Sequence, residues 1–379
     1  MKKLLYIALC LLLLGCSTAP VQQSDLLARL NQAAQQGVIF FGQEDAVIYG
    51  HYATAWAAPA FRSDIETVSG KKPLIVGFDL GGIESGDSVN LDGVPFETMR
   101  KAAQQHIADG GIVTFSWHPR NPVTMGDAWD TCGIRNARIE DIETRIEPWL
   151  AAVGDFLASV LYQPSLADTL NTASSAQLIF RPWHEHTGWW FWWGNETLTP
   201  EDYQHLWHYT VNSVNSVNKP NKLNKLNQPN QLNQPNQPNQ PNQLLWAYSP
   251  NLGVDKEGYM ERYPGDDVVD ILGFDCYQFD TDPTSYMSDL DRTLAFMTEL
   301  GQEHGKPIAL TETGFEGLKT PDWWTMVLLP VVEKYPLSYL MVWRNAYDKP
   351  AHYYAPFAGE PSADDFIRFI SNDKIKMLK

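Results

Sequence analysis

The chain has 379 residues, of which 44% are hydrophobic and 19% charged, so it can build the core of two average domains or of one large barrel. Its 45 acidic residues outnumber its 28 basic residues and give a net charge of -17, which argues against a nucleic-acid-binding protein, because that binding requires basic side chains to neutralise phosphates. The same charge argues against docking on anionic lipid through a basic patch.

The first predicted element is a targeting segment. Lys2 and Lys3 precede an apolar run over residues 4–14, which is too short to span a bilayer and is typical of a secretory signal. The run ends in Gly15-Cys16, which resembles the cleavage and lipidation motif of bacterial lipoproteins. We therefore expect residues 1–16 to be a lipoprotein-type signal, Cys16 to carry the lipid and residues 17–23 to be a tether.

The expected location is the bacterial outer membrane, on its periplasmic side or at the cell surface. Secretion after ordinary signal cleavage is the alternative. The chain has four cysteines, too few for a disulfide scaffold. Beyond the signal only Cys132 and Cys276 remain, and we expect two packed thiols, with a disulfide between them as the alternative.

Eight short apolar runs alternate with helical patterns through the rest of the chain. The runs read as strands buried on both faces: Val38–Gln43, Leu74–Leu80, Ile112–His118, Leu178–Glu185, Leu244–Asn251, Val268–Tyr277, Ile308–Gly314 and Tyr339–Ala346. The predicted helices are Phe96–Ala108, Ile139–Leu161, Glu201–Val211, Tyr286–His304, Trp323–Lys334 and Ala363–Ile370. This alternation predicts an α/β fold, a single (β/α)8 TIM barrel over residues 24–379. A doubly wound open sheet is the alternative. The first run is not followed by a glycine-rich phosphate turn, which argues against a nucleotide-binding sheet of that kind.

One segment departs from this alternation. Asn recurs at every third position from Asn212 to Asn242, which indicates a low-complexity insertion over residues 212–243 that is disordered or locally extended. It falls between the fourth helix and the fifth strand, on the face of a barrel opposite the active site. We interpret it as a tolerated repeat expansion, with a polar interaction tract as the alternative.

Two glutamates mark the candidate site. In a (β/α)8 barrel the carboxyl ends of the strands build the active site, and Glu185 and Glu312 lie at the ends of the fourth and seventh predicted strands. Two carboxylates that flank one bond are what glycoside hydrolysis requires, one as proton donor and the other as nucleophile or base. Their separation, which distinguishes retention from inversion, does not follow from the sequence.

Two histidines raise the alternative of a metal site. Strand alternation would place His184 and His186 on one side and Glu185 on the other, so a metal ion would need a third ligand, for which His118 is the candidate. We expect no metal and no other cofactor; a metallohydrolase would instead lose activity with a chelator. For His118 the plain alternative is a packed core histidine, and for Arg344 a structural ion pair.

Four of the five residues from Trp189 to Trp193 are tryptophans. Not all of them can face one groove, so some must belong to the core. We expect at least one to line a sugar-binding cleft, because flat aromatic rings stack on sugar rings.

The segment Arg181–Gly194, with the sequence RPWHEHTGWWFWWG, resembles the acid/base region of glycoside hydrolase family 26. Four more segments resemble that family in the same order: Trp117-His118-Pro119 followed by Asn121–Thr124, Gly273–Tyr277, Thr311–Gly314 and Val342–Ala346. The resemblance extends over most of the mature chain. The family consists mainly of endo-β-1,4-mannanases with a retaining (β/α)8 barrel.

The resemblance implies that Glu185 is the acid/base and Glu312 the nucleophile. It implies that Tyr277 hydrogen-bonds the nucleophile and that Trp343 lies under the reacting sugar. The residues that would bind sugar at or near the scissile bond are His118, His184, Trp190 and Arg344. His186-Thr187 and Arg120 depart from the usual family pattern, which affects the detail of sugar binding more than the reaction.

The implied substrate is β-mannan or a manno-oligosaccharide, cleaved without a cofactor by a monomer that meets the membrane only through its lipid. The same chemistry on another β-glycan, such as β-1,3-xylan or a mixed-linkage glucan, is one alternative. A glycan-binding lipoprotein without activity is another, and the presence of both Glu185 and Glu312 argues against it. The long polar segment Gly81–Pro95 is a candidate wall across the cleft, which would release short units such as mannobiose instead of mixed lengths.

Overall fold

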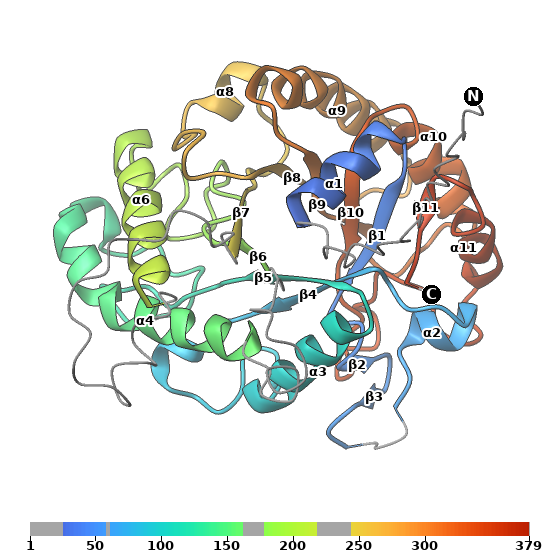
Figure 1. The fold of residues 1–379 in the computed structure, drawn as a ribbon, viewed down its shortest axis with the longest axis horizontal. Coiled ribbons are helices and arrows are strands. Elements are labelled where there is room, and N and C mark those ends of the chain that lie inside the picture. The colour runs from blue at the N-terminus through green and yellow to red at the C-terminus, as the bar shows by residue number, and fades with distance from the viewer. Residues whose placement is uncertain (1–25, 58–60, 162–177, 218–243, 379) are drawn as a thin grey trace, which may run out of the picture.

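A computed structural model describes residues 26–57, 61–161, 178–217 and 244–378 (Figure 1). Its centre is a barrel of eight parallel strands: β1 (Ile39–Glu44), β4 (Ile75–Asp79), β5 (Ile112–Ser116), β6 (Leu178–Arg181), β7 (Leu244–Tyr248), β8 (Ile271–Gln278), β9 (Ile308–Phe315) and β10 (Leu337–Val342). Each strand pairs in parallel with the next, and β10 pairs with β1, so the sheet closes on itself. The predicted (β/α)8 barrel is confirmed.

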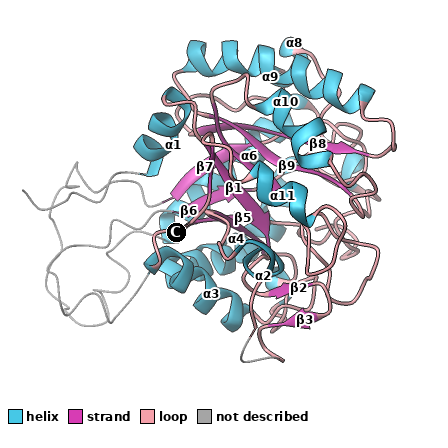
Figure 2. Ribbon diagram, turned by 90° about the vertical axis from the view of Figure 1, so that its right-hand side faces the viewer, coloured by secondary structure: helices cyan, strands magenta, loops and turns pink. Residues whose placement is uncertain are grey.

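Helices surround this barrel (Figures 1 and 2). They are α1 (Leu26–Gln35), α2 (Asp64–Ser69), α3 (Phe96–Ala108), α4 (Ile139–Leu161), α6 (Pro200–Val217), α8 (Lys256–Met260), α9 (Thr284–His304), α10 (Leu329–Val332) and α11 (Ala363–Phe369). The predicted helix Trp323–Lys334 consists of a π-helix, Trp324–Leu328, followed by the short α10. None of the described helices is long and apolar enough to cross a membrane.

Several short elements lie outside the predicted alternation. Two 3-10 turns occupy Ile83–Ser85 and Ile134–Asn136. The strands β2 (Tyr49–Gly50) and β3 (Ala53–Thr54) form a small antiparallel hairpin, and β11 (Ile375–Lys376) pairs in parallel with the start of β1. These pieces have too few residues to carry a periodic pattern.

Helix α1 closes one end of the barrel. Leu26 and Leu30 are buried in one cluster with side chains at the beginnings of the strands, among them Ile75, Ile112 and Ile179. Figure 2 places α1 at the same end of the molecule as the C-terminus. The site must therefore form at the other end, where the strands finish.

The structure corrects two predictions about individual segments. Residues 212–217 of the low-complexity insertion continue α6 and are helical, and the rest of the insertion lies outside the described residues, as do the predicted signal, Cys16 and the tether. Cys276 is buried, as expected of a packed thiol, but Cys132 is an exposed free cysteine. The prediction that Cys132 is packed is wrong, because it lies in a surface loop before α4.

Candidate active site

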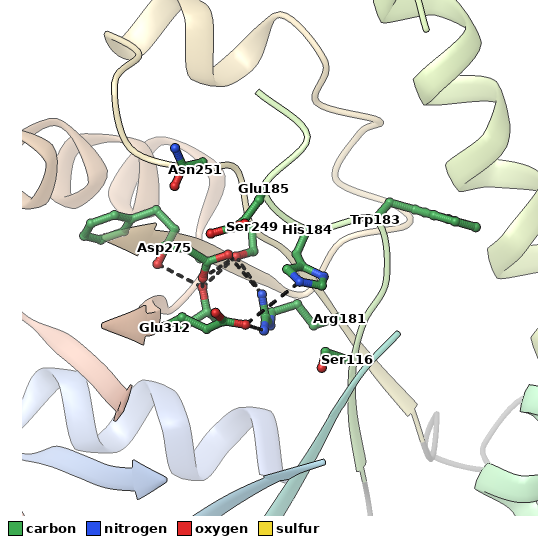
Figure 3. Close-up of polar contacts among 12 residues, drawn as sticks. Ser116, Arg181, Trp183, His184, Glu185, Ser249, Asn251, Asp275 and Glu312 are labelled. Atoms are coloured by element: carbon green, nitrogen blue, oxygen red, sulfur yellow. Dashed lines mark hydrogen bonds and ion pairs between the residues drawn. The ribbon is translucent and has the colours of Figure 1, made fainter. Parts of the chain in front are cut away.

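A buried arginine joins two carboxylates at the mouth of the barrel. Arg181, the last residue of β6, donates from Nη1 to Asp275 Oδ2 at 3.0 Å and from Nη2 to Glu312 Oε1. Figure 3 shows these three side chains converging from β6, β8 and β9. All three are at least 95% buried, so water cannot solvate their charges and each charge is stabilised by the opposite charge beside it. Glu312 is thereby held in one position.

The position of Asp275 is fixed by further hydrogen bonds. Ser249 Oγ and Thr311 Oγ1 donate to Asp275 Oδ1 at 3.0 and 2.7 Å. Burial raises the pKa of Asp275 to about 7, although the charge of Arg181 acts in the opposite direction. The roles of Arg181 and Asp275 were not predicted from the sequence. The feature that could have indicated them is a charged residue near the end of an apolar strand.

The second oxygen of Glu312 accepts a hydrogen bond from Tyr277. The Tyr277 hydroxyl lies 2.7 Å from Glu312 Oε2, which is the contact that the family resemblance implies. Burial and the charge of Glu312 raise the pKa of Tyr277 well above its ordinary value, so the phenol stays protonated and can donate. Arg181 and Tyr277 thus donate to different oxygens of Glu312 and fix the orientation of its carboxyl group.

Glu185 reaches the same place from the loop that follows β6. Its backbone N–H donates to Ser249 O at 2.8 Å, and its Oε2 accepts from Trp190 Nε1 at 2.9 Å. One carboxyl oxygen each from Glu185, Asp275 and Glu312 lies within 4.8 Å of the others. Retaining glycosidases separate their two carboxyl groups by about 5–5.5 Å and inverting ones by about 6.5–9.5 Å. The separation of Glu185 and Glu312 fits the retaining class.

Electrostatics distinguish the two glutamates. Burial raises the pKa of Glu185 well above its ordinary value, and the negative charges of Glu312 and Asp275 raise it further. Glu185 is therefore suited to hold a proton at neutral pH, whereas Glu312 is hydrogen-bonded as an acceptor. One protonated and one ionised carboxyl group is the arrangement that a general acid and a nucleophile need.

Two histidines connect the site to β4. His118 Nδ1 lies 2.6 Å from Asp79 Oδ2, and His118 Nε2 lies 3.1 Å from His184 Nε2. Burial lowers the pKa of His118, but the charge and hydrogen bond of Asp79 outweigh it and raise this pKa overall. Burial and the charge of Arg181 lower the pKa of His184 well below its ordinary value. We therefore assign His118 as the cationic donor and His184 as the neutral acceptor, 4.0 Å from Glu312 Oε1.

The predicted alternation around Glu185 is wrong. Strand β6 ends at Arg181, and Glu185 has a φ of 53°, so the segment that follows is not extended. His184 faces His118, while the His186 ring packs against Tyr203 and Tyr248 with centroid distances of 4.2 and 4.8 Å. The two histidines do not face one space. Within the described residues, no cluster with the geometry of a metal site contains a histidine.

The carboxylate trio is close enough to bind a cation. Glu185, Asp275 and Glu312 form the one group in the described part of the chain with that spacing. Arg181 already donates to two of the three and supplies a fixed positive charge at the same place. The arrangement is suited to acid–base chemistry that uses the arginine as its cation.

The tryptophan-rich segment after Glu185 divides between core and surface. Trp192 and Trp193 are fully buried, and Trp193 Nε1 donates to His184 O at 2.8 Å, which holds the loop that carries Glu185. Trp190 is partly exposed beside Glu185, and Trp189 is 65% exposed. Trp343 is also partly exposed, directly after β10.

Arg344 forms an ion pair across the mouth of the barrel. Its Nη2 lies 2.7 Å from Asp92 Oδ1, and its Nη1 donates to the Tyr49 hydroxyl at 3.1 Å. Arg344 thus forms the structural ion pair that was the alternative to sugar binding. Its role in sugar binding stays a prediction. Asp92 belongs to the segment Gly81–Pro95, so the ion pair ties that segment to the loop after β10.

A closed barrel with two carboxyl groups so close together at its mouth has the arrangement of a retaining glycoside hydrolase. The sequence profile of glycosyl hydrolase family 26 matches residues 17–310, and the chain belongs to this family. The match ends two residues before Glu312, whose place in the site is given by the geometry described above.

Relatives of known activity cover most of the chain. A mannan endo-1,4-β-mannosidase of Bifidobacterium adolescentis is 26% identical over 362 residues, 89% of this chain and 33% of that protein. One of Bacillus subtilis is 25% identical over 78% of this chain and 73% of its own length. The solved structure of a family 26 β-mannanase from Bacteroides ovatus is 39% identical, with a TM-score of 0.79 over 94% of this chain and 95% of that one. The chain thus spans about a third of the Bifidobacterium relative but nearly all of the Bacteroides structure.

Proposed function

We propose that this chain is a retaining endo-β-1,4-mannanase. The observation that carries the proposal is the placement of Glu185 and Glu312, with carboxyl oxygens within 4.8 Å, at the mouth of a family 26 barrel. The mannanase activities of the Bacillus and Bacteroides relatives, which the chain matches over most of their lengths, support mannan as the substrate.

In the first step Glu312 attacks the anomeric carbon of the sugar while Glu185 protonates the departing oxygen. Arg181 and Tyr277 hold Glu312 in place for this attack. Trp343 provides an aromatic surface under the reacting sugar, and Trp190 one next to Glu185. The products of the step are a covalent glycosyl-enzyme and an ionised Glu185.

In the second step Glu185 accepts a proton from water, and the water oxygen attacks the anomeric carbon. The bond to Glu312 breaks, and the sugar leaves with the configuration it had at the start. His184, which is neutral and buried beside Glu312, has an Nδ1 without a partner among the described residues and is the candidate to hydrogen-bond a sugar hydroxyl. His118 uses both of its ring nitrogens on Asp79 and His184, so its own contact with the sugar stays a prediction.

The test is a product time course on linear β-1,4-mannan. Wild type should release manno-oligosaccharides whose new ends have the β configuration by NMR. Glu312→Ala should release none, and Glu185→Gln should be slower by about 10²–10⁴-fold. Glu140→Gln, on the exposed start of α4, is the matched control and should behave as wild type. A wild type that leaves mannan intact but cleaves xylan or a mixed-linkage glucan would refute the substrate, and α products would refute the mechanism.

We propose further that the segment Gly81–Pro95 limits product length. Asp92 and Arg344 join this segment to the loop after β10 through a buried ion pair, and Tyr347 donates to Asp92 O at 3.4 Å. These contacts support the proposal of a wall beside Trp343. Shortening the segment should change early products from short oligomers to mixed lengths, as chromatography of the time course would reveal, and an unchanged product pattern would refute the wall.

We propose that Cys16 carries a lipid and that the enzyme is anchored at the outer membrane. Support comes from the sequence at residues 13–16 and from α1, which begins at Leu26 on the barrel end opposite the site. An anchor there would leave the site facing away from the bilayer. Labelled palmitate should be incorporated into the wild type in a bacterial host and not into Cys16→Ser; equal labelling of both would refute the site.

A further inference from the structure

A cavity of about 230 Å³ lies beside the candidate catalytic groups, between the loops that follow β4 and β5. His118 lines this cavity and also contacts His184, so it borders both the cavity and the site. Trp129 lines it as well; its ring stacks on His118 with centroids 5.7 Å apart, and about half of its surface, 52%, is exposed. The cavity therefore opens next to the position of the reacting sugar.

Hydrogen bonds between the two loops preform the cavity. Glu84 accepts from the backbone N–H of Arg120 at 3.0 Å and from Trp117 Nε1 at 3.2 Å. Arg120 Nε donates to Ser85 Oγ at 2.8 Å. Asp87 also lines the cavity, and its exposed carboxylate has no hydrogen-bond partner among the described residues. A ligand can thus enter without rearranging the loops.

The cavity lies to one side of the line that joins Trp190, after β6, to Trp343, after β10. These are the two aromatic surfaces assigned above to the polysaccharide. Between these strands the barrel order places β4 and β5 on one side, and β9 with Glu312 on the other. A main chain that follows this line can pass beside the cavity, which lies on the β4 and β5 side, while Glu312 reaches it from the other side.

We propose that this cavity is a side pocket that receives a single hexosyl branch of the polysaccharide main chain. Its volume is below the roughly 300–1,000 Å³ of pockets for drug-sized ligands, and about eight times the ~30 Å³ that one water occupies in the liquid. It has room for one sugar ring and not for a run of them. An aromatic ring beside an open carboxylate is a combination suited to a sugar, because the ring packs on C–H groups and the carboxylate accepts from hydroxyls.

The inference rests on the proposed function, and the experiment separates the two. Val89 lines the cavity and is 39% exposed, so Val89→Trp should fill it. Ile367→Trp, at a residue of α11 that is 40% exposed, is the matched control. The measurement is kcat/KM on linear β-1,4-mannan and on galactomannan, which has single galactosyl branches. Val89→Trp should lower the ratio of branched to linear activity by ~10-fold, because the branch loses its pocket, with linear activity unchanged.

Asp87→Ala provides an independent variant that removes the carboxylate without adding bulk. It should lower the same ratio, and it decides the question if thermal unfolding shows that Val89→Trp does not fold. A ratio equal to that of wild type, or an equal loss on both substrates, overturns the side pocket while leaving the mannanase proposal intact. A wild type inactive on both mannans overturns the two together.

Discussion

At the scale of the residue, the hydrogen bond from Tyr277 to Glu312 is the contact most open to a clean test. Tyr277→Phe removes only the hydroxyl that donates to Glu312 Oε2 at 2.7 Å. Hydrogen bonds to charged groups contribute about 1.5–3 kcal/mol, so kcat should fall by about 10- to 100-fold. KM should change little, and the variant should still unfold in one cooperative transition. Steady-state kinetics with thermal unfolding checks this, and an unchanged kcat would show that Arg181 alone positions Glu312.

Replacing Trp190 with phenylalanine should change the pH dependence of kcat/KM. Trp190 Nε1 donates to Glu185, and this bond lowers the pKa of Glu185 against the larger effect of burial, which raises it. Without the bond the pKa rises further, so Glu185 stays protonated to higher pH. The alkaline limb of kcat/KM should therefore move to higher pH in Trp190→Phe and not in Trp189→Phe, whose ring is mostly exposed. Identical limbs in wild type and Trp190→Phe would contradict this.

The candidate catalytic pair could be predicted because Glu185 and Glu312 stand in motifs that chemistry constrains. Arg181, Asp275 and Asp79 could not be assigned roles, because a charge at a strand end has the same appearance in sequence whether it pairs with a neighbour or meets solvent. Their partners come from other strands, separated by as many as 131 positions in the chain, as for Arg181 and Glu312. Only closure of the barrel brings them together.

At the scale of the element, β4 depends on a glycine for its packing against β1. A Cβ on Gly77 would lie 1.8 Å from Glu44 Oε2 and 2.8 Å from Met341 Sδ. Glu44 is buried, neither of its carboxyl oxygens has a described partner, and burial raises its pKa well above the ordinary value. Gly77→Ala should therefore destabilise the protein by about 1–3 kcal/mol in urea unfolding, because the enclosed carboxyl group has no solvent to move into.

The double variant Glu44→Ala with Gly77→Ala provides the control. Removing the carboxyl group makes room for the new methyl group, so Gly77→Ala should cost less in the Glu44→Ala background than in wild type. An equal cost in both backgrounds would place the strain elsewhere, at Met341.

Elements were predictable where their patterns are long. The bounds of α3 and α4 agree with the prediction, since 13 and 23 residues carry several turns of helical periodicity. The ends of the strands were not predicted correctly. The strands β5, β6 and β10 end before His118, Glu185 and Trp343, respectively, which the predicted strands include. Aromatic and apolar residues continue past each strand because the loops they belong to are themselves buried over the barrel mouth. Hydrophobicity does not distinguish a buried strand from a buried loop.

At the scale of the whole molecule, alternation of strands and helices sufficed to predict the barrel, because a parallel sheet of eight strands with helices between them has few ways to bury both faces. The plug at its base could not be predicted in the same way. Helix α1 has ten residues and precedes the first strand, outside the strand–helix repeat. Leu26 and Leu30 are buried only because they cover the end of the barrel where the strands begin. The two ends of the molecule thus have separate tasks, one closed by α1 and one open for chemistry.

This separation predicts that residues 218–243 are dispensable for activity. The segment lies between α6, which ends at Val217, and β7, which begins at Leu244. Leu244 pairs with Leu178 at the start of β6, on the closed end of the barrel. Replacing the segment with a Gly/Ser linker of roughly eight residues should leave kcat/KM on linear mannan within about twofold of wild type, because Glu185 and Glu312 lie at the opposite end. A folded variant that has lost activity would instead show that the tract acts on the site or on the substrate.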